Sequence, residues 1–101
     1  ADPKATQEVV RILKEHPQWS MRTLAAGALG RLGKAGSAKE ATQALSDAAR
    51  TEPFALVRED ALVALVDVDP EGARSLARDL STKDAEPKVR EVAARIAKTG
   101  R

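Results

Sequence analysis

One short pattern, an apolar residue followed by Arg-x-x-Ala, occurs three times in this chain of 101 residues. The three copies begin at Met21-Arg22, Val57-Arg58 and Val89-Arg90. Arg58 follows Arg22 by 36 residues, and Arg90 follows Arg58 by 32. A period of this length is typical of repeat proteins, in which a small unit of secondary structure buries its apolar face only by stacking on its neighbours. The pattern therefore predicts a stack of similar units.

The residues around the three copies predict six helices and no strand. Asp2-Pro3 and Asp69-Pro70 each combine a capping carboxylate with a proline, which needs no hydrogen-bonded N–H at the first helical position. His16-Pro17 and Glu52-Pro53 end helices, because the residue before a proline is driven out of the helical region. The expected helices cover about residues 3–15, 20–33, 37–51, 54–68, 70–80 and 87–99, with a polar loop at 81–86.

Further cap signals refine these boundaries. Ser20 is expected to cap the second helix, and Ser37 together with Glu40 has the spacing of a capping box at the start of the third. Gly33 is expected to end the second helix, and Gly100 to follow the sixth as its terminating residue.

These elements predict an all-α fold. Each helix pair carries too little apolar surface to fold alone, so we expect three antiparallel pairs stacked as a right-handed α-solenoid. Residues 1–101 would form a single domain, with repeats at about 2–33, 37–68 and 69–100. The core must be built from alanine and aliphatic residues, because Trp19 and Phe54 are the only aromatic side chains apart from one histidine.

The two ends of the stack differ in their predicted polarity. The first helix carries an apolar arc wider than one partner helix can cover, made of Val9, Val10, Ile12 and Leu13. The sixth helix is amphipathic and suits a solvent-exposed end. We therefore expect an apolar patch at the N-terminal end, incompletely buried at Val10, which a preceding repeat or a second copy of the chain would cover.

The second-helix residues resemble those of HEAT repeats, in particular the short HEAT-like repeats of phycobilisome-lyase type. The resemblance rests on Asp84-Ala85-Glu86-Pro87-Lys88-Val89-Arg90 with Val92-Ala93-Ala94, and on Ala25-Ala26-Gly27-Ala28-Leu29-Gly30. It implies an α-solenoid whose second helices line a concave, protein-binding surface. The acid six residues before the arginine is Asp84 in the third copy and Glu52 in the second, but His16 takes its place in the first. A ladder of acid–arginine pairs is therefore expected to be incomplete at the N-terminal end.

Two sets of candidate residues follow from the repeat. The repeat arginines Arg22, Arg58 and Arg90 are interpreted as structural, each reaching an acidic turn between helices through charge-assisted hydrogen bonds. The candidate partner-binding residues share the outward positions of the second helices: Thr23, Gly27, Arg31, Glu59, Val63, Asp67, Glu91, Arg95 and Lys98. This surface carries both charges and no aromatic residue.

No catalytic, cofactor or metal site is predicted. Residues 30–34 fail as a phosphate loop, because Ala28 and Ala35 replace its required glycine and hydroxyl residue. The chain has no cysteine, so thiolate metal sites are excluded. His16, the only histidine, lies at a helix end, where a cation is favourable in any case. Ser20 and Ser37 occupy cap positions rather than a nucleophile elbow.

Trp19 allows two interpretations. An aromatic residue in the turn before a second helix usually closes the gap between the two helices of its pair. The same residue exposed at the surface would be a hot spot for a partner, since tryptophan is enriched among such residues. The sequence favours the packing role.

The predicted function is a non-enzymatic protein-interaction or scaffold module, bound by a protein partner or by flanking repeats. Nucleic-acid binding is a rival, but the formal charge is only +2 and Glu59, Asp67 and Glu91 interrupt the expected surface. A platform subunit of a chromophore lyase and an accessory domain of a large peptidase are further alternatives by family analogy. No membrane-spanning or signal segment is read from the sequence, which begins at Ala1 and is interpreted as an excised domain or a processed protein.

Overall fold

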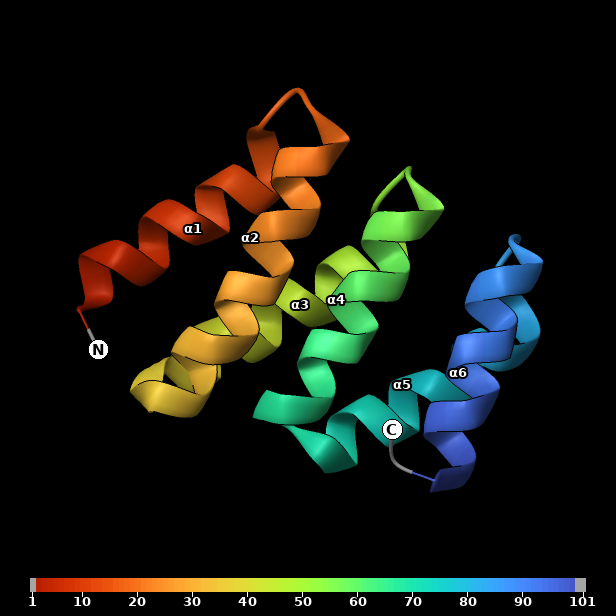
Figure 1. The fold of residues 1–101 in the computed structure, drawn as a ribbon. Coiled ribbons are helices and arrows are strands. Elements are labelled where there is room, and N and C mark those ends of the chain that lie inside the picture. The colour runs from red at the N-terminus through yellow and green to blue at the C-terminus, as the bar shows by residue number, and fades with distance from the viewer. Residues whose placement is uncertain (1, 100–101) are drawn as a thin grey trace.

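The computed structural model describes residues 2–99, and this part of the chain is helical apart from short turns. Its helices are α1 (Pro3–Glu15), α2 (Trp19–Leu32), α3 (Ala38–Thr51), α4 (Ala55–Val68), α5 (Pro70–Lys83) and α6 (Pro87–Thr99) (Figure 1). A short π-helical segment, η1 (Gly33–Ser37), joins α2 to α3. The predicted all-α class is confirmed for the described residues.

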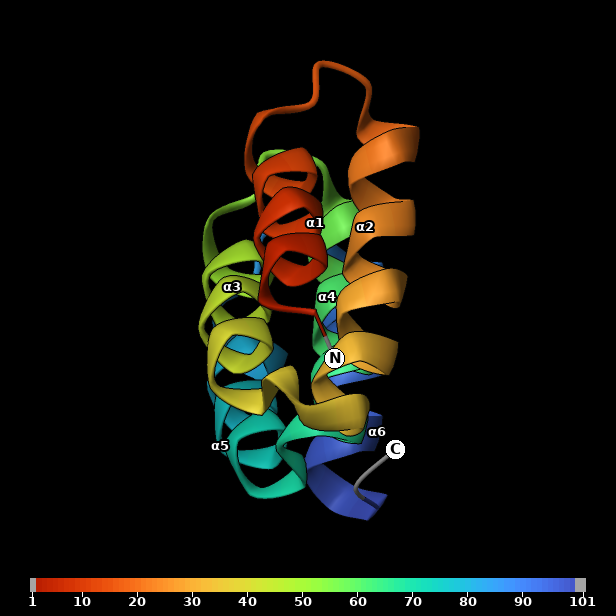
Figure 2. The ribbon, with the colours of Figure 1, turned by 90° about the vertical axis from the view of Figure 1, so that its left-hand side faces the viewer.

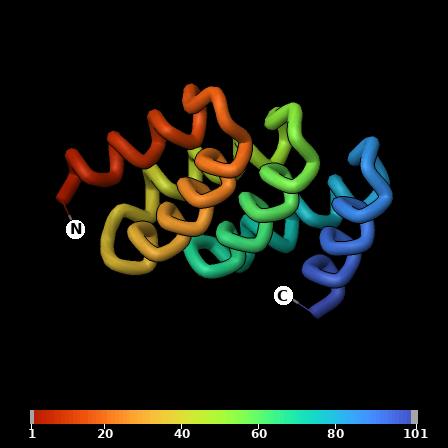
Figure 3. Tube along the Cα trace, turned by 45° about the horizontal axis from the view of Figure 1, so that its top comes forward, coloured from red at the N-terminus to blue at the C-terminus, as the bar shows by residue number. Residues whose placement is uncertain are grey.

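The helices form two layers. Seen from the side, α1, α3 and α5 lie in one layer and α2, α4 and α6 in the other (Figure 2). Consecutive helices pair across the layers, so that α1 packs on α2, α3 on α4 and α5 on α6, and the three pairs follow one another along the molecule (Figure 3). Below we call the layer of α2, α4 and α6 the front layer and the other the back layer. The Cα positions extend over 36 × 28 × 14 Å, as expected for two layers of helices.

Alanine and aliphatic side chains form the core between the layers. Its large fully buried members include Leu29, Leu45, Leu62 and Leu65, while alanines such as Ala26 and Ala61 fill the closest contacts between helices. Small residues permit this close approach, because the interior is packed to the density of a crystal. Helices α3 and α5 each bury one face in this core, at Ala41, Ala44, Leu45 and Ala48 and at Ala73, Leu76, Ala77 and Leu80.

The two Asp-Pro helix starts form as predicted. The Asp2 carboxylate accepts a hydrogen bond from the Lys4 N–H, and the Asp69 carboxylate accepts one from the Gly72 N–H at 3.1 Å. In both places a proline is the first helical residue. Each carboxylate therefore satisfies a backbone donor that has no partner inside its helix.

The predicted Ser20 cap is wrong, and the predicted Ser37 cap has the expected position but not the expected hydrogen bond. Helix α2 begins at Trp19, so Ser20 lies inside it and the cap position belongs to Gln18. Ser37 does stand at the cap position of α3, but its side chain makes no capping hydrogen bond. Its hydroxyl instead accepts a hydrogen bond of 2.8 Å from the fully buried Thr6 hydroxyl of α1. A long-range partner has replaced the local one.

Helix α2 ends at Leu32 with Gly33 as its C-cap residue, as predicted, but Gly33 is not the residue at which the chain turns. Its backbone is helical, with φ −62° and ψ −42°, and the chain turns three residues later at Gly36, whose φ is +136°. Only glycine adopts that conformation readily. Gly33 has a different reason to be glycine, because an added Cβ would lie 2.6 Å from a Val68 methyl group. It permits α2 to approach the end of α4.

Helix α5 is longer than predicted and continues to Lys83. Ser81 and Thr82, assigned to a loop in the sequence analysis, donate their hydroxyl hydrogen bonds to helix carbonyls of Arg78 and Asp79. These bonds let hydroxyl residues remain in a last helical turn. The predicted stop at Gly100 lies outside the described residues.

The N-terminal end of the stack exposes apolar surface, as predicted. Of the four residues in the apolar arc of α1, only Leu13 is fully buried, whereas Val9, Val10 and Ile12 are partly exposed. Leu24 on α2 adds to this end and is 64% exposed. In the repeat alignment Leu24 corresponds to Val92, which is only 2% exposed because α6 packs on α4. Position in the stack therefore sets the exposure of these residues.

We expect Val10→Thr to lower the free energy of unfolding by less than about 1 kcal/mol, because Val10 keeps contact with water in the folded chain. Leu13→Ala, a buried site in the same helix, should cost about 2–5 kcal/mol. Urea unfolding of both variants measures the difference. A loss at Val10 as large as that at Leu13 would show that a second molecule covers α1 in solution.

Candidate protein-binding face

Five of the nine candidate binding residues line one shallow groove. It runs between α2 and α4 on the front layer, has a volume of about 280 Å³, and is lined by Thr23, Gly27, Arg31, Asp60, Val63, Ala64 and Asp67. The small residues of α2 leave this space open, and the Arg31 guanidinium lies beside Gly27. The repeat spacing therefore brought together residues from two helices 36 positions apart.

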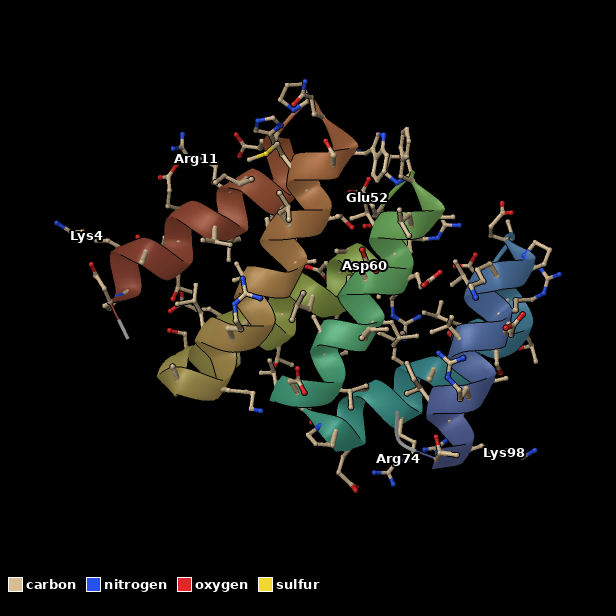
Figure 4. The ribbon with its side chains drawn as sticks, in the orientation of Figure 1. Lys4, Arg11, Glu52, Asp60, Arg74 and Lys98 are labelled. Atoms are coloured by element: carbon tan, nitrogen blue, oxygen red, sulfur yellow. The ribbon has the colours of Figure 1, made fainter. Side chains whose placement is uncertain are left out.

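Asp60 also lines this groove and is not among the residues predicted from the sequence. Its carboxylate accepts a hydrogen bond of 2.5 Å from the Thr23 hydroxyl and so joins α4 to α2 (Figure 4). In the repeat alignment Asp60 occupies the position that Leu24 holds in the first copy and Val92 in the third, and both of those residues are apolar. An acid at an apolar column was the signal that could have identified it.

The other four candidate residues lie outside the groove. Glu59 is half-buried on α4, while Glu91, Arg95 and Lys98 are exposed on α6. Lys98 points outward from the far side of α6 (Figure 4). The candidate set therefore divides into a groove between α2 and α4 and a separate charged surface on α6.

An exposed aromatic pair lies near the N-terminal ends of α2 and α4. Trp19 at the start of α2 and Phe54 before α4 stack with ring centroids 5.7 Å apart and planes 12° from parallel. The Arg22 guanidinium lies 5.8 Å from the centre of the Phe54 ring, within the range of a cation–π interaction. Trp19 is still 39% exposed, and Phe54 48%. The interpretation of Trp19 as filler within its own helix pair is corrected, because its aromatic partner comes from the next pair.

Exposed large apolar side chains gather on one part of the molecule. Within residues 2–99 they lie on α2, on α4 or in the turn before α4: Trp19, Leu24, Phe54, Leu56 and Val63. Helices α1, α3, α5 and α6 expose no large apolar side chain to this degree in the described structure. Such a gathering marks an interaction surface more often than single exposed residues do.

A second groove lies in the back layer between α1 and α3. It has a volume of about 390 Å³, and its lining includes the apolar Leu13 and Ala48 together with the charged Lys14 and Asp47. The corresponding seam between α3 and α5 is bridged by an ion pair of 3.0 Å from Arg50 to Asp79. The α1–α3 seam is the more apolar of the two, but its rim is charged.

The repeat arginines of the first two pairs hold the stack together. The Arg22 guanidinium binds the Glu52 carboxylate with nitrogen–oxygen distances of 2.8–3.2 Å. Arg58 binds Asp84 in a bidentate pair, with both distances 2.9 Å. Each arginine therefore reaches the acid of the following pair, across the boundary between repeats, and both acids are buried.

Hydrogen bonds to Arg58 lower the pKa of the Asp84 carboxyl below its ordinary value, and this effect outweighs the desolvation that would raise it. The same hydrogen bonds raise the pKa of Arg58. Both groups are therefore charged at neutral pH, and their pairing favours the folded chain.

The ladder of acid–arginine pairs is not incomplete at the N-terminal end, as predicted, but at the other end. His16 removes no partner from Arg22, because Arg22 uses Glu52, and the His16 ring accepts a hydrogen bond from the Gln18 N–H. Arg90 is the repeat arginine that meets no carboxylate within residues 2–99. The one hydrogen bond of its guanidinium there runs from Nη1 to the Asp84 carbonyl, at 2.8 Å. The open rung is at the C-terminal end.

The comparisons agree with the repeat pattern. A family model for HEAT repeats matches residues 1–66, about two thirds of the chain. No curated protein and no solved structure matches this chain. Within the described residues, no helix has the length and apolar character needed to cross a membrane. The chain belongs to the HEAT repeat family, whose members generally mediate protein interactions or act as scaffolds.

Proposed function

We propose that this HEAT-repeat chain is a non-enzymatic scaffold or protein-interaction module, and that its partner binds the side formed by α2 and α4. The observation that carries this proposal is the gathering of exposed large apolar side chains on those two helices and the turn before α4. Interface cores are rich in aromatic residues and depleted in charged ones, which matches the exposed Trp19–Phe54 pair.

The proposed architecture is a right-handed α-solenoid of three repeats, at about 2–33, 37–68 and 69–100, forming one domain. The two layers of helices support it, as do the ion pairs by which Arg22 and Arg58 each bind an acid of the following helix pair. In such a stack the second helices present a continuous surface, so residues of α2, α4 and α6 can contact one partner.

The chemistry of the face suits a folded protein or a peptide. An aromatic pair and Val63 supply apolar area, while Arg31 and Asp67 in the adjoining groove offer charges of both signs. Aromatic anchors surrounded by a polar rim are the usual anatomy of a protein interface. A polyanion would meet Asp67 and Asp60 in the same groove, which disfavours nucleic acid.

Site-specific photo-crosslinking tests the proposal. With a benzoylphenylalanine at Val63, irradiation in an extract of the cells that make the protein should give discrete adducts with a protein. The matched control carries the same group at Ser75, an exposed position on the back-layer helix α5. Adducts at Val63 should decrease when Trp19 is changed to alanine in the crosslinking chain, because the aromatic pair borders the same surface.

Equal adducts from Val63 and Ser75 would contradict a front-layer site. So would submicromolar binding to duplex DNA at physiological salt that is lost on charge reversal of Arg95 and Lys98. That second result would replace the scaffold proposal with nucleic-acid binding, since phosphate contacts respond to such reversals.

A further inference from the structure

All three repeat arginines are held by the same backbone anchor. In each, Nη1 donates a 2.8 Å hydrogen bond to the carbonyl of the residue six positions earlier: His16 for Arg22, Glu52 for Arg58 and Asp84 for Arg90. The carbonyl lies at the end of the preceding helix in every case. The anchor fixes where the remaining nitrogens of the guanidinium can reach.

The nitrogens left free by the anchor are Nε and Nη2, which form one edge of the planar guanidinium. In Arg22 and Arg58 this edge binds both oxygens of a carboxylate. Arg90 has the same anchor, but within residues 2–99 no acid meets its Nε–Nη2 edge. The pairs made by Arg22 and Arg58 therefore indicate that this edge of Arg90 suits a carboxylate.

We propose that Arg90 is a binding site for a carboxylate carried by an acidic side chain of the partner. This inference rests on the proposed function and adds a contact at the C-terminal end of the front layer. A guanidinium edge and a carboxylate form two parallel hydrogen bonds, which gives a stronger and more specific contact than a point charge gives.

The surface around Arg90 favours a polar contact rather than another tightly packed helix. In the repeat alignment Lys98 occupies the position of Gly30 in the first copy and of Val66 in the second. At Gly30 the next helix packs so closely that an added Cβ would lie 3.2 Å from Ala64. Lys98 is exposed on α6, about 12 Å along the helix from Arg90 by the rise of 1.5 Å per residue. Glu91 lies between them, 3.8 Å from the Lys88 ammonium. We therefore expect an acidic partner segment that reaches Arg90 and Lys98 together.

A second copy of this chain stacked head to tail does not supply the carboxylate. In that arrangement the side chain opposite Arg90 would stand where Glu52 stands opposite Arg22, and at this position the first pair carries His16. Imidazole cannot accept two parallel hydrogen bonds. The acid must therefore come from a different protein, the partner.

Arginine side-chain NMR tests the proposal on the intact chain, with sodium acetate as the probe and sodium chloride at equal ionic strength as the control. The Arg90 Nε–H signal should move saturably with acetate, while those of Arg22 and Arg58, already paired, should not. Arg90→Lys keeps the charge but removes the fork, so acetate should no longer perturb the neighbouring Glu86 and Ala94 amides. Circular dichroism would establish that this variant is folded.

Three results would overturn the proposal: a linear Arg90 response no larger than that of the exposed Arg95, a stronger saturable response to inorganic phosphate than to acetate, or an Arg90 signal that moves with protein concentration alone. The second would assign the site to phosphate, and the third to another copy of the chain. Crosslinking at Val63 would be unaffected by any of them, so failure here is distinguishable from failure of the proposed function.

Discussion

Leu62→Ala should lower the free energy of unfolding by about 2–5 kcal/mol, the usual range for removing a large buried side chain. Leu62 is fully buried on α4, the helix that packs against α2, α3, α5 and α6. A cavity at this point is enclosed on all sides and cannot collapse easily. Leu65→Ala, 1% exposed in wild type, should behave in the same way, and urea denaturation measures both.

Val63→Ala is the matched control for this prediction. Val63 is the next residue of the same helix but is 48% exposed, so its truncation should cost no more than about 0.5 kcal/mol. A loss below that value at Leu62 would contradict the placement of α4 at the centre of the stack.

The helices themselves were largely readable from the sequence, because their signals are local. Asp2-Pro3 and Asp69-Pro70 each bring a capping carboxylate and a suitable proline together within two residues. The errors arose where tertiary contacts outweighed local chemistry. Ser37 looks like a cap, but its hydroxyl pairs with Thr6, 31 residues away in the chain. Gly33 follows α2 as expected, but the chain turns only at Gly36, and Val68 leaves no room for a Cβ at Gly33.

The candidate site was only partly readable. The arginine register identified the outward positions of the second helices, and five of the nine selected residues do meet in one groove. The register could not show which neighbour an arginine pairs with, because that depends on the stacking of one pair on the next. His16 was therefore read as a missing partner for Arg22, whereas the acid of each rung comes from the following pair. The stacking of Trp19 on Phe54 crosses the same boundary and was missed for the same reason.

The contact between Arg58 and Asp84 should contribute more to the free energy of unfolding than any other ion pair in the described chain. Asp84→Asn is expected to lower the free energy of unfolding by about 3 kcal/mol, the lower end of what breaking a buried ion pair costs. The two side chains are only 13% and 3% exposed, so Arg58 would be left without a counter-charge in a poorly solvated place. Arg58→Met should cost a similar amount, and the double variant less than the sum of the two single changes.

Asp79→Asn is the matched control, because Asp79 also pairs with an arginine of the preceding helix pair but lies at the surface. Water and salt screen that contact, so its loss should be much smaller than the loss at Asp84. Equal losses at the two positions in chemical denaturation would mean that the ladder contributes no more than any surface pair.

Lowering the pH should weaken the ion pair between Arg58 and Asp84 without any substitution at either residue. Pairing with Arg58 depresses the pKa of Asp84 in the folded chain below its unfolded value. A depressed carboxyl pKa stabilises the fold above the unfolded value, near 3.9 for aspartate, and this contribution disappears as the pH falls through the folded pKa. The wild type should therefore lose its advantage over Asp84→Asn as the pH drops from about 5 towards 2. Because asparagine cannot titrate, stability curves that remain parallel over that range would show that Asp84 does not hold Arg58 as a charged partner.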